Sequence, residues 1–131
     1  MPISLSLDVR AYSNAGIRGH LDVTITGRND GNEPILNDSH LLGFYLRDLT
    51  GNDVRGFHRI PPNGPDMGGP IKRGETFERV ISFDTGPVNI QQQYVLTCVH
   101  LETRDYVQTT FDFVPIFLQS GGQPPFAPVQ S

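Results

Sequence analysis

The 131 residues of the chain include one cysteine and no tryptophan. Cys98 has no second cysteine with which to form a disulfide within the chain, a pattern typical of reducing compartments. The first residues, MPISLSLDVR, lack the cationic and apolar segments of a signal peptide, and every apolar run is far shorter than a bilayer span. The sequence therefore predicts a cytoplasmic protein without a membrane partner, although a virion component would have the same features.

Basic residues are also few. The 10 Lys and Arg residues are outnumbered by 14 Asp and Glu residues, the formal net charge is −4, and the two signs are mixed along the chain. Without a basic stripe the surface does not neutralise phosphates, and a mildly acidic surface repels nucleic acid and anionic lipid. The composition therefore predicts no nucleic-acid partner.

The helical pattern of apolar residues is missing as well, because no window keeps the i, i+3, i+4, i+7 spacing for three turns. Apolar and polar residues alternate instead, and 14 Gly and 11 Pro supply turns. We expect 54–60 to return as the antiparallel partner of 41–49 after a hairpin turn. The pattern predicts an all-β fold, an immunoglobulin-like antiparallel β-sandwich of about seven strands. The predicted strands are 3–10, 20–28, 41–49, 54–60, 76–84, 93–103 and 106–114.

The segment 93–103, QYVLTCVHLET, is predicted to be the central strand. Tyr94, Leu96 and Cys98 fall on one side, and apolar residues also occupy the other side, which is typical of a strand covered on both faces. Tyr94 lies four residues before Cys98, whereas a tyrosine corner places the tyrosine two residues before the cysteine position. We therefore expect Tyr94 to be a core residue without a corner.

Two stretches have the composition of irregular structure. Residues 61–70, PPNGPDMGGP, are predicted to form an unusually long surface loop, and such loops often carry function. Pro115 interrupts the last strand, so 116–118 is expected at a sheet edge or packed across the end of the sandwich. We expect one sandwich domain over 1–119 and a Gly/Pro-rich tail over 120–131 that is disordered or extended unless a partner captures it.

Three signals in order resemble a known group of domains: VTITGRNDGNEPI, then FYLRDLTGNDVRGF, then IKRGETFERVISF followed by QYVLTCVHL. They are similar to small bacterial immunoglobulin-like domains of the intracellular proteinase inhibitor (BsuPI-like) and CARDB-like kind, over roughly residues 20–102. Arg73-Gly74-Glu75 stands where those domains usually have Pro-Gly-Glu, and Gln92-Gln93-Tyr94 where they have Gly-Thr/Ser-Tyr. The resemblance implies an immunoglobulin-like fold and the binding of proteins, with protease inhibition as one possibility, and it implies no catalytic residue.

The residues that carry chemistry are scattered. Cys98 and His100 share a strand face and are able to reach one metal ion, but no third ligand is indicated, so a buried, hydrogen-bonded His100 is the favoured interpretation. The oxygen-rich turn at 29–34 lacks the ligand spacing of a calcium loop. No G-x-S-x-G elbow is present, and no glycine pair precedes a helix that would bind phosphate. We therefore predict a protein that is not an enzyme and uses no metal or cofactor.

What remains is a protein-binding role. The predicted binding residues are Arg55, Phe57, His58, Arg59, Asp66, Met67, Phe117 and Phe126. A phenylalanine between arginines has the composition of an interaction hot spot, although Phe57 filling the core, with the arginines in solvent, accounts for the same pattern. The last two residues belong to a C-terminal end that is predicted to join subunits by self-association. The alternative is a small-ligand or carbohydrate-binding sandwich using Tyr12, Tyr45 and Tyr106, which the lack of tryptophan disfavours.

Overall fold

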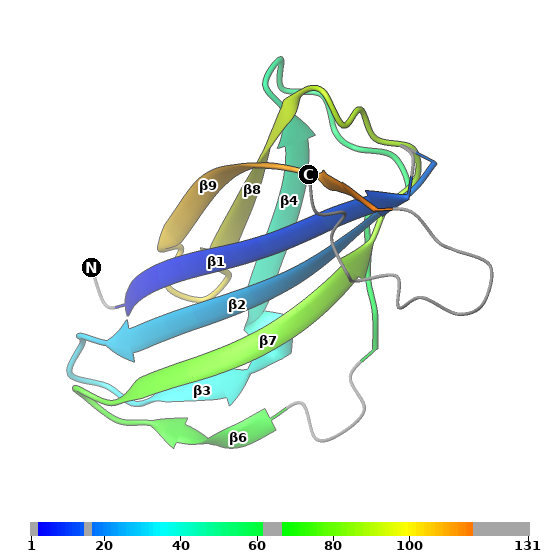
Figure 1. Ribbon diagram of the computed structural model, residues 1–131. Helices are drawn as coiled ribbons and strands as arrows, with labels where there is room; N and C mark the ends of the chain where they lie inside the picture. Colours follow the sequence, from blue (N-terminus) through cyan, green and yellow to red (C-terminus); the bar gives the residue numbers. More distant parts are fainter. Residues whose placement is uncertain (1–2, 15–16, 62–66, 117–131) are drawn as a thin grey trace.

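The computed structural model describes residues 3–14, 17–61 and 67–116. Within these residues the chain is all-β, as predicted, and its one helical element is a 3-10 turn at Ser39–Leu41. Figure 1 shows the strands as two main layers, with a short two-stranded ladder below them. The strands are β1 (Ile3–Asn14), β2 (Gly19–Asn29), β3 (Ile35–Asp38), β4 (Leu42–Asp48), β5 (His58–Arg59), β6 (Met67–Ile71), β7 (Thr76–Asp84), β8 (Gln93–His100), β9 (Tyr106–Asp112) and β10 (Val114–Ile116).

The first layer has the strand order β10-β1-β2-β7-β5, and the second has the order β4-β8-β9. Neighbouring strands are antiparallel except β1 and β10, which run parallel over Tyr12–Asn14 and Val114–Ile116. Strands β3 and β6 pair only with each other, beside β7 (Figure 1). The chain therefore passes between the two main layers several times, and each crossing brings distant segments together.

The core lies between the two layers, and it follows the predicted alternation. Leu21, Val23 and Ile25 of β2 are fully buried, and Leu96 and Cys98 of β8 meet them from the other layer. Burial raises the pKa of the Cys98 thiol to about 12, although the nearby positive charge of Arg59 opposes the shift, so this cysteine is a small apolar core residue rather than a nucleophile.

The prediction that β8 is central is confirmed, but the prediction that both of its faces are covered is wrong. Val95 and Val99 on the outer face are only half-buried, and Leu101 just beyond the strand is 50% exposed. No other element among the described residues packs over this side. An apolar pattern on both sides of a strand here marks one buried face and one face open to solvent.

Two predictions about the middle of the chain are also wrong. Segment 54–60 does not return along β4: after a single bridge between Arg47 and Asp53 it crosses to the other layer, where β5 pairs with β7. The stretch 61–70 is not irregular throughout, because β6 starts at Met67 and pairs with β3. Proline has no N–H to donate to a regular ladder. Pro70 fits here because the β3–β6 pairing has a register shift between Ile35 and Asn37.

Tyr94 makes the backbone contact that its distance from Cys98 argued against. Its hydroxyl accepts a hydrogen bond from the backbone N–H of Asn89, five residues upstream, at 2.8 Å. Its ring packs edge-on against Phe113, with centroids 5.2 Å apart. The contact resembles a tyrosine corner in joining the ring hydroxyl to upstream backbone, although here the hydroxyl accepts from an N–H.

Tyr94→Phe is expected to lower the free energy of unfolding by about 1 kcal/mol, because the Asn89 N–H loses its acceptor while the ring keeps its packing. Urea unfolding of the two proteins measures the difference. Tyr45→Phe is the matched control: this ring is 45% exposed, and its change should stay within about 0.5 kcal/mol. Equal effects of the two substitutions would contradict the assigned contact.

Candidate binding surfaces

The predicted binding residues 55–59 do not form one surface. Phe57 packs into the core, where its ring stacks on Phe83 with centroids 4.9 Å apart and planes 20° from parallel. Of the two interpretations of this residue, core filling is therefore the one that the structure supports. Phe57 is half-buried, and a contact of this residue with a partner stays a prediction.

Arg59 also faces inward. One terminal nitrogen donates a hydrogen bond to the backbone oxygen of Leu42 at 2.8 Å, and the guanidinium carbon lies 5.4 Å from the centroid of the Phe44 ring. These contacts place a charged side chain along the free edge of β4, which protects that edge from pairing with another strand. The role of Arg59 is structural.

Arg55 and His58 remain exposed, in different places. Arg55 lines an open groove of about 360 Å³ at one end of the sandwich, together with Asp48, Asp53 and Gln92. The Nδ1 atom of His58 donates to the backbone oxygen of Gly56 at 2.7 Å. Met67 is placed only as the first residue of β6. Asp66, Phe117 and Phe126, and the predicted tail 120–131, lie outside the described residues.

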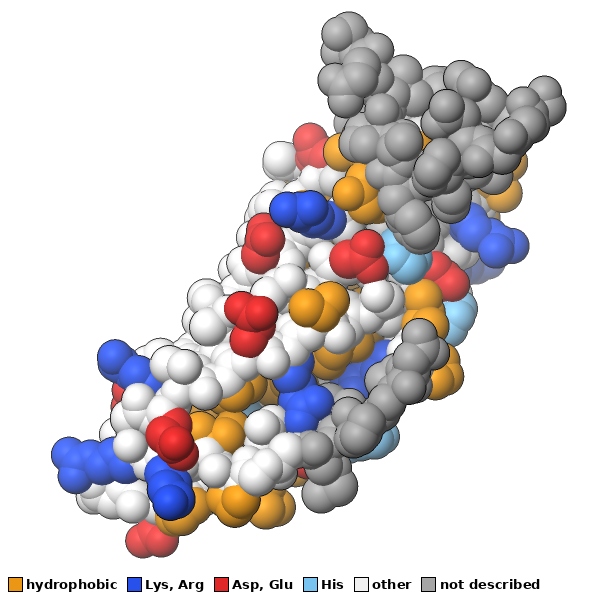
Figure 2. Space-filling model, turned by 60° about the horizontal axis from the view of Figure 1, so that its bottom comes forward, with side chains coloured by type: hydrophobic (Ala, Val, Ile, Leu, Met, Phe, Trp, Pro, Cys, Tyr) orange, Lys and Arg blue, Asp and Glu red, His pale blue; other side chains and the backbone are white. Residues whose placement is uncertain are grey.

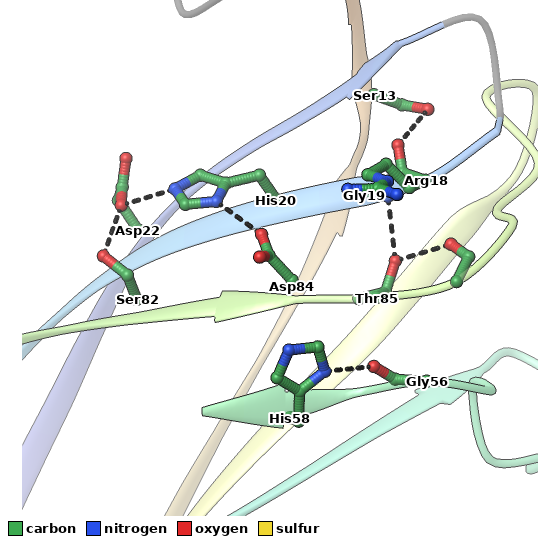
Figure 3. Close-up of polar contacts among 11 residues, drawn as sticks. Ser13, Arg18, Gly19, His20, Asp22, Gly56, His58, Ser82, Asp84 and Thr85 are labelled. Carbon is green, nitrogen blue, oxygen red and sulfur yellow. Dashed lines mark hydrogen bonds and ion pairs between the residues drawn. The ribbon is translucent and has the colours of Figure 1, made fainter. Parts of the chain in front are cut away.

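A polar cluster that the sequence did not reveal lies on the outer face of β2 and β7 (Figure 3). His20 stands between two carboxylates: its Nδ1 is 2.9 Å from Asp84 and its Nε2 is 2.9 Å from Asp22. Ser82 donates to the same oxygen of Asp22 at 2.7 Å. The strand register explains the cluster, because His20 lies opposite Asp84 and Asp22 lies opposite Ser82.

The cluster resembles a catalytic triad in composition but not in geometry. Both ring nitrogens of His20 contact carboxylates, and the Ser82 hydroxyl contacts Asp22 rather than His20. A nucleophilic serine requires a hydrogen bond to its base and a base with a free nitrogen. The arrangement instead suits a histidinium that joins two strands.

The pKa of His20 reflects two opposed effects. Partial burial lowers it, but hydrogen bonds to Asp84 and Asp22 and the charges of both carboxylates outweigh burial, so the pKa is raised above 6.5. A raised pKa in the folded chain means that protonation favours folding. This stabilisation is complete below about pH 6.5 and is lost as the pH rises through the pKa of folded His20.

His20→Gln is expected to destabilise the chain more at pH 6 than at pH 9, because glutamine carries no charge between Asp22 and Asp84. Unfolding by urea at about five pH values gives the stability difference at each. His40→Gln is the control, since this histidine is exposed and lies elsewhere. A stability difference that stays constant or grows as the pH rises would contradict the bridging role.

His100 is buried and hydrogen-bonded, as predicted: it is 2% exposed, and its Nδ1 accepts from the backbone N–H of Thr103 at 3.2 Å. Burial lowers the pKa of His100 against the opposing charges of Glu102 and Asp105. Among the residues that the structure describes, no three His, Cys, Asp or Glu side chains are grouped to hold a metal ion.

The outer faces of the two main layers differ in chemistry. The face over β1, β2 and β7 carries serine, threonine and charged residues, and in Figure 2 backbone and side chains that are neither hydrophobic nor charged cover most of it. Val80 is its one large exposed apolar side chain over these three strands as far as they are described. This face has the composition of an ordinary solvated surface.

The other face, over β4, β8 and β9, is mostly apolar or uncharged; we call it the three-stranded face. Tyr45, Leu101 and Tyr106 are 45%, 50% and 62% exposed. Leu101 lies over Gly43, with one methyl carbon 3.1 Å from where a Cβ would be. The residues of this face are Gly43, Tyr45, Arg47, Gln93, Val95, Thr97, Val99, Leu101, Tyr106, Gln108, Thr110 and Asp112. A grouped set of exposed aromatic and aliphatic side chains is typical of interaction sites.

Comparison of the chain with family models, with curated proteins and with solved structures finds no match. The resemblance to intracellular proteinase inhibitor and CARDB-like domains therefore stays a prediction. Over the described part of the chain, no helix has the length and apolar character needed to cross a membrane.

Proposed function

We propose that the chain is a non-catalytic immunoglobulin-like module that binds protein, as an inhibitor or adaptor or as a subunit of an assembly. The observation that carries the proposal is the three-stranded face, where exposed Tyr45, Leu101 and Tyr106 gather. Tyrosines supply large contact areas at low entropic cost, which favours them at protein interfaces. A cytoplasmic location belongs to the same proposal and is supported by the single, buried cysteine.

The strand order supports the immunoglobulin-like part of the proposal. In a seven-stranded immunoglobulin sandwich, strands A, B, E and D form one sheet and strands C, F and G the other. Here β1-β2-β7-β5 and β4-β8-β9 have the same order when they are lettered along the chain. The parallel pairing of β10 with the end of β1 and the β3-β6 ladder are additions to that plan.

The surroundings of two reactive side chains within the described residues support the non-catalytic part. Cys98 is buried with a raised pKa, and His20 is held between two carboxylates. Neither residue is placed to act as a nucleophile or a base.

Affinity capture tests the proposal, with the wild-type chain and two variants as baits. Tyr106→Asp puts a charge on the three-stranded face, and Val80→Asp puts one on the opposite face, at a residue that is 65% exposed. A protein that binds wild type and Val80→Asp but not Tyr106→Asp supports the proposal. Binding that Tyr106→Asp leaves unchanged contradicts it. For the inhibitor version, a protease panel without inhibition at micromolar chain contradicts that version alone.

The second candidate, a small-ligand or carbohydrate-binding sandwich, is favoured by the groove beside Arg55. Its volume of about 360 Å³ is within the range of small-molecule sites, and Asp48, Asp53 and Gln92 give it polar groups. A glycan array without hits, together with no thermal stabilisation by a small-molecule library, would remove this candidate.

A further inference from the structure

We propose that the three-stranded face binds a second copy of this chain, with β4 of each copy over β9 of the other. This inference rests on the proposed protein-binding function and names the partner. It is argued from where the apolar and charged residues of the face lie, because these decide which surface is complementary to it.

The registers of β4, β8 and β9 divide the face into rows. Gly43, Val99 and Tyr106 form one row, and Leu101 adds to it from beyond the strand end. Tyr45, Thr97 and Gln108 form the next row. Arg47, Val95 and Thr110 form the third, and Asp112 stands one step further along β9. The face is thus apolar at one end and uncharged in the middle. The other end carries Asp112 of β9, Arg47 of β4 and, beside β4, Asp53, which is paired with Arg47.

These rows select one two-fold arrangement. An axis parallel to the strands keeps every row at its own height, so apolar rows stack on each other and β4 lies over the partner's β9. Arg47 of one copy then lies near Asp112 of the other, since the two differ by about 7 Å along the strand. An axis perpendicular to the strands would instead put Arg47 and Asp112 against the apolar row. The charge pattern of the face is therefore complementary to itself in the first arrangement only.

Arg47 is already positioned on the face. Its guanidinium carbon lies 5.7 Å from the centroid of the Tyr45 ring, and its Nε donates to Asp53 at 3.0 Å. These contacts hold the exposed positive group beside Tyr45 and Asp53, so in the dimer Arg47 would lie between Asp53 of its own copy and Asp112 of the other. An exposed ion pair adds little affinity, so Arg47 and Asp112 would set the orientation while the tyrosines and Leu101 supply binding energy.

The size of the face predicts a weak dimer. Three strands of about seven residues give a flat footprint of roughly 350 Å² on each copy, below the roughly 800 Å² per partner of a standard stable interface. We therefore expect a concentration-dependent equilibrium between monomer and dimer rather than a permanent dimer.

Sedimentation equilibrium of the full chain from about 5 to about 1000 µM tests the proposal. Wild type should shift from monomer to dimer mass, and Tyr106→Asp should raise the dissociation constant at least about tenfold. Val80→Asp, on the opposite face, should change the dissociation constant less than about twofold. Thermal unfolding of each variant confirms that it is folded.

A charge exchange tests the orientation. Arg47→Glu and Asp112→Lys should each weaken association about three- to tenfold, and the double variant should return to within about twofold of wild type. Weakening without recovery in the double variant would overturn the arrangement of β4 over β9.

Three results would overturn the second copy as the partner. The first is a wild type that stays monomeric at all concentrations. The second is a dimer that Tyr106→Asp leaves intact. The third is a dimer that is lost when the chain ends at Gln119 but is kept by Tyr106→Asp, which would assign self-association to the C-terminal end with Phe117 and Phe126. A monomeric wild type that still captures a protein, with capture lost in Tyr106→Asp, leaves the proposed function standing.

Discussion

Phe83→Ala is expected to lower the free energy of unfolding by about 4 kcal/mol. Phe83 is 2% exposed and lies between two other rings, with centroid distances of 4.9 Å to both Phe44 and Phe57. These rings come from β4, from the segment before β5 and from β7 itself, so the substitution leaves a cavity where three parts of the chain meet. The aromatic pairs add about 1 kcal/mol each beyond the buried area, which places the loss at the upper end for a phenylalanine.

Guanidinium unfolding of Phe83→Ala measures the loss, and Val80→Ala is the matched control on the same strand. Val80 is 65% exposed on the outer face, so its truncation should cost less than about 0.5 kcal/mol. Phe83→Leu fills part of the cavity and should lose roughly half as much as alanine. A loss below about 1.5 kcal/mol for Phe83→Ala would show that Phe44 and Phe57 close the gap.

The long strands could be predicted from the sequence because each buries one face only. In β2, Leu21, Val23 and Ile25 are fully buried and Thr26 is exposed. Apolar and polar residues therefore alternate because one face of the strand lies in the core and the other faces solvent. The same holds for β1 and for most of β4. Burial of one face imposes the pattern, and the pattern therefore reveals the strand.

The short strands could not be predicted, since pairing rather than burial defines them. β5 has two residues, His58 and Arg59, and its pairing with β7 depends on contacts more than twenty residues away in the sequence. β3 and β6 pair with each other over a register shift. Segments this short carry no periodicity, and the turn signal before 54–60 fitted a hairpin on β4 equally well.

Arg79 is a charged residue at a position of β7 where the alternation predicts an apolar one, and the sequence did not explain it. It interrupts the apolar phase that Phe77, Ile81 and Phe83 keep along β7. In the structure its Nε and a terminal nitrogen donate to Asn37 Oδ1 at 3.1 and 2.8 Å, and that nitrogen also donates to the Asn37 backbone oxygen at 2.8 Å. The inward charge therefore marks a polar contact with β3, which the sequence did not predict.

The candidate surfaces depend on the relative placement of strands, which the sequence specifies only indirectly. His20, Asp22 and Asp84 were each predictable as outward residues, but Asp84 reaches His20 across 64 positions through the β2–β7 register. The three-stranded face was mistaken for a second buried face because Val95, Val99 and Leu101 are apolar. A face that binds a partner and a face that lies in the core have similar composition, so only the surrounding elements distinguish them.

Asn29→Ala is expected to lower the free energy of unfolding by about 3 kcal/mol. The sequence placed this residue in a polar turn, but it is fully buried at the end of β2. Its amide nitrogen donates to the backbone oxygens of Glu33 and Ile71, each at 2.8 Å, and its side-chain oxygen accepts from the N–H of Gly31 at 2.9 Å. Alanine would remove the partner of three backbone groups, and the Ile71 oxygen is the one whose bond is fully buried.

Asn32→Ala is the matched control, because this asparagine belongs to the same turn and is exposed, and its effect should stay within about 0.5 kcal/mol. Asn29→Asp separates hydrogen bonding from size: a carboxylate accepts from Gly31 but cannot donate to Glu33 or Ile71, so it should destabilise the chain at least as much as alanine at neutral pH. Urea unfolding of the three variants measures these differences. If Asn29→Asp were as stable as wild type, the amide donations would not be what joins the end of β2 to β6, and the attachment of the β3–β6 ladder would need another explanation.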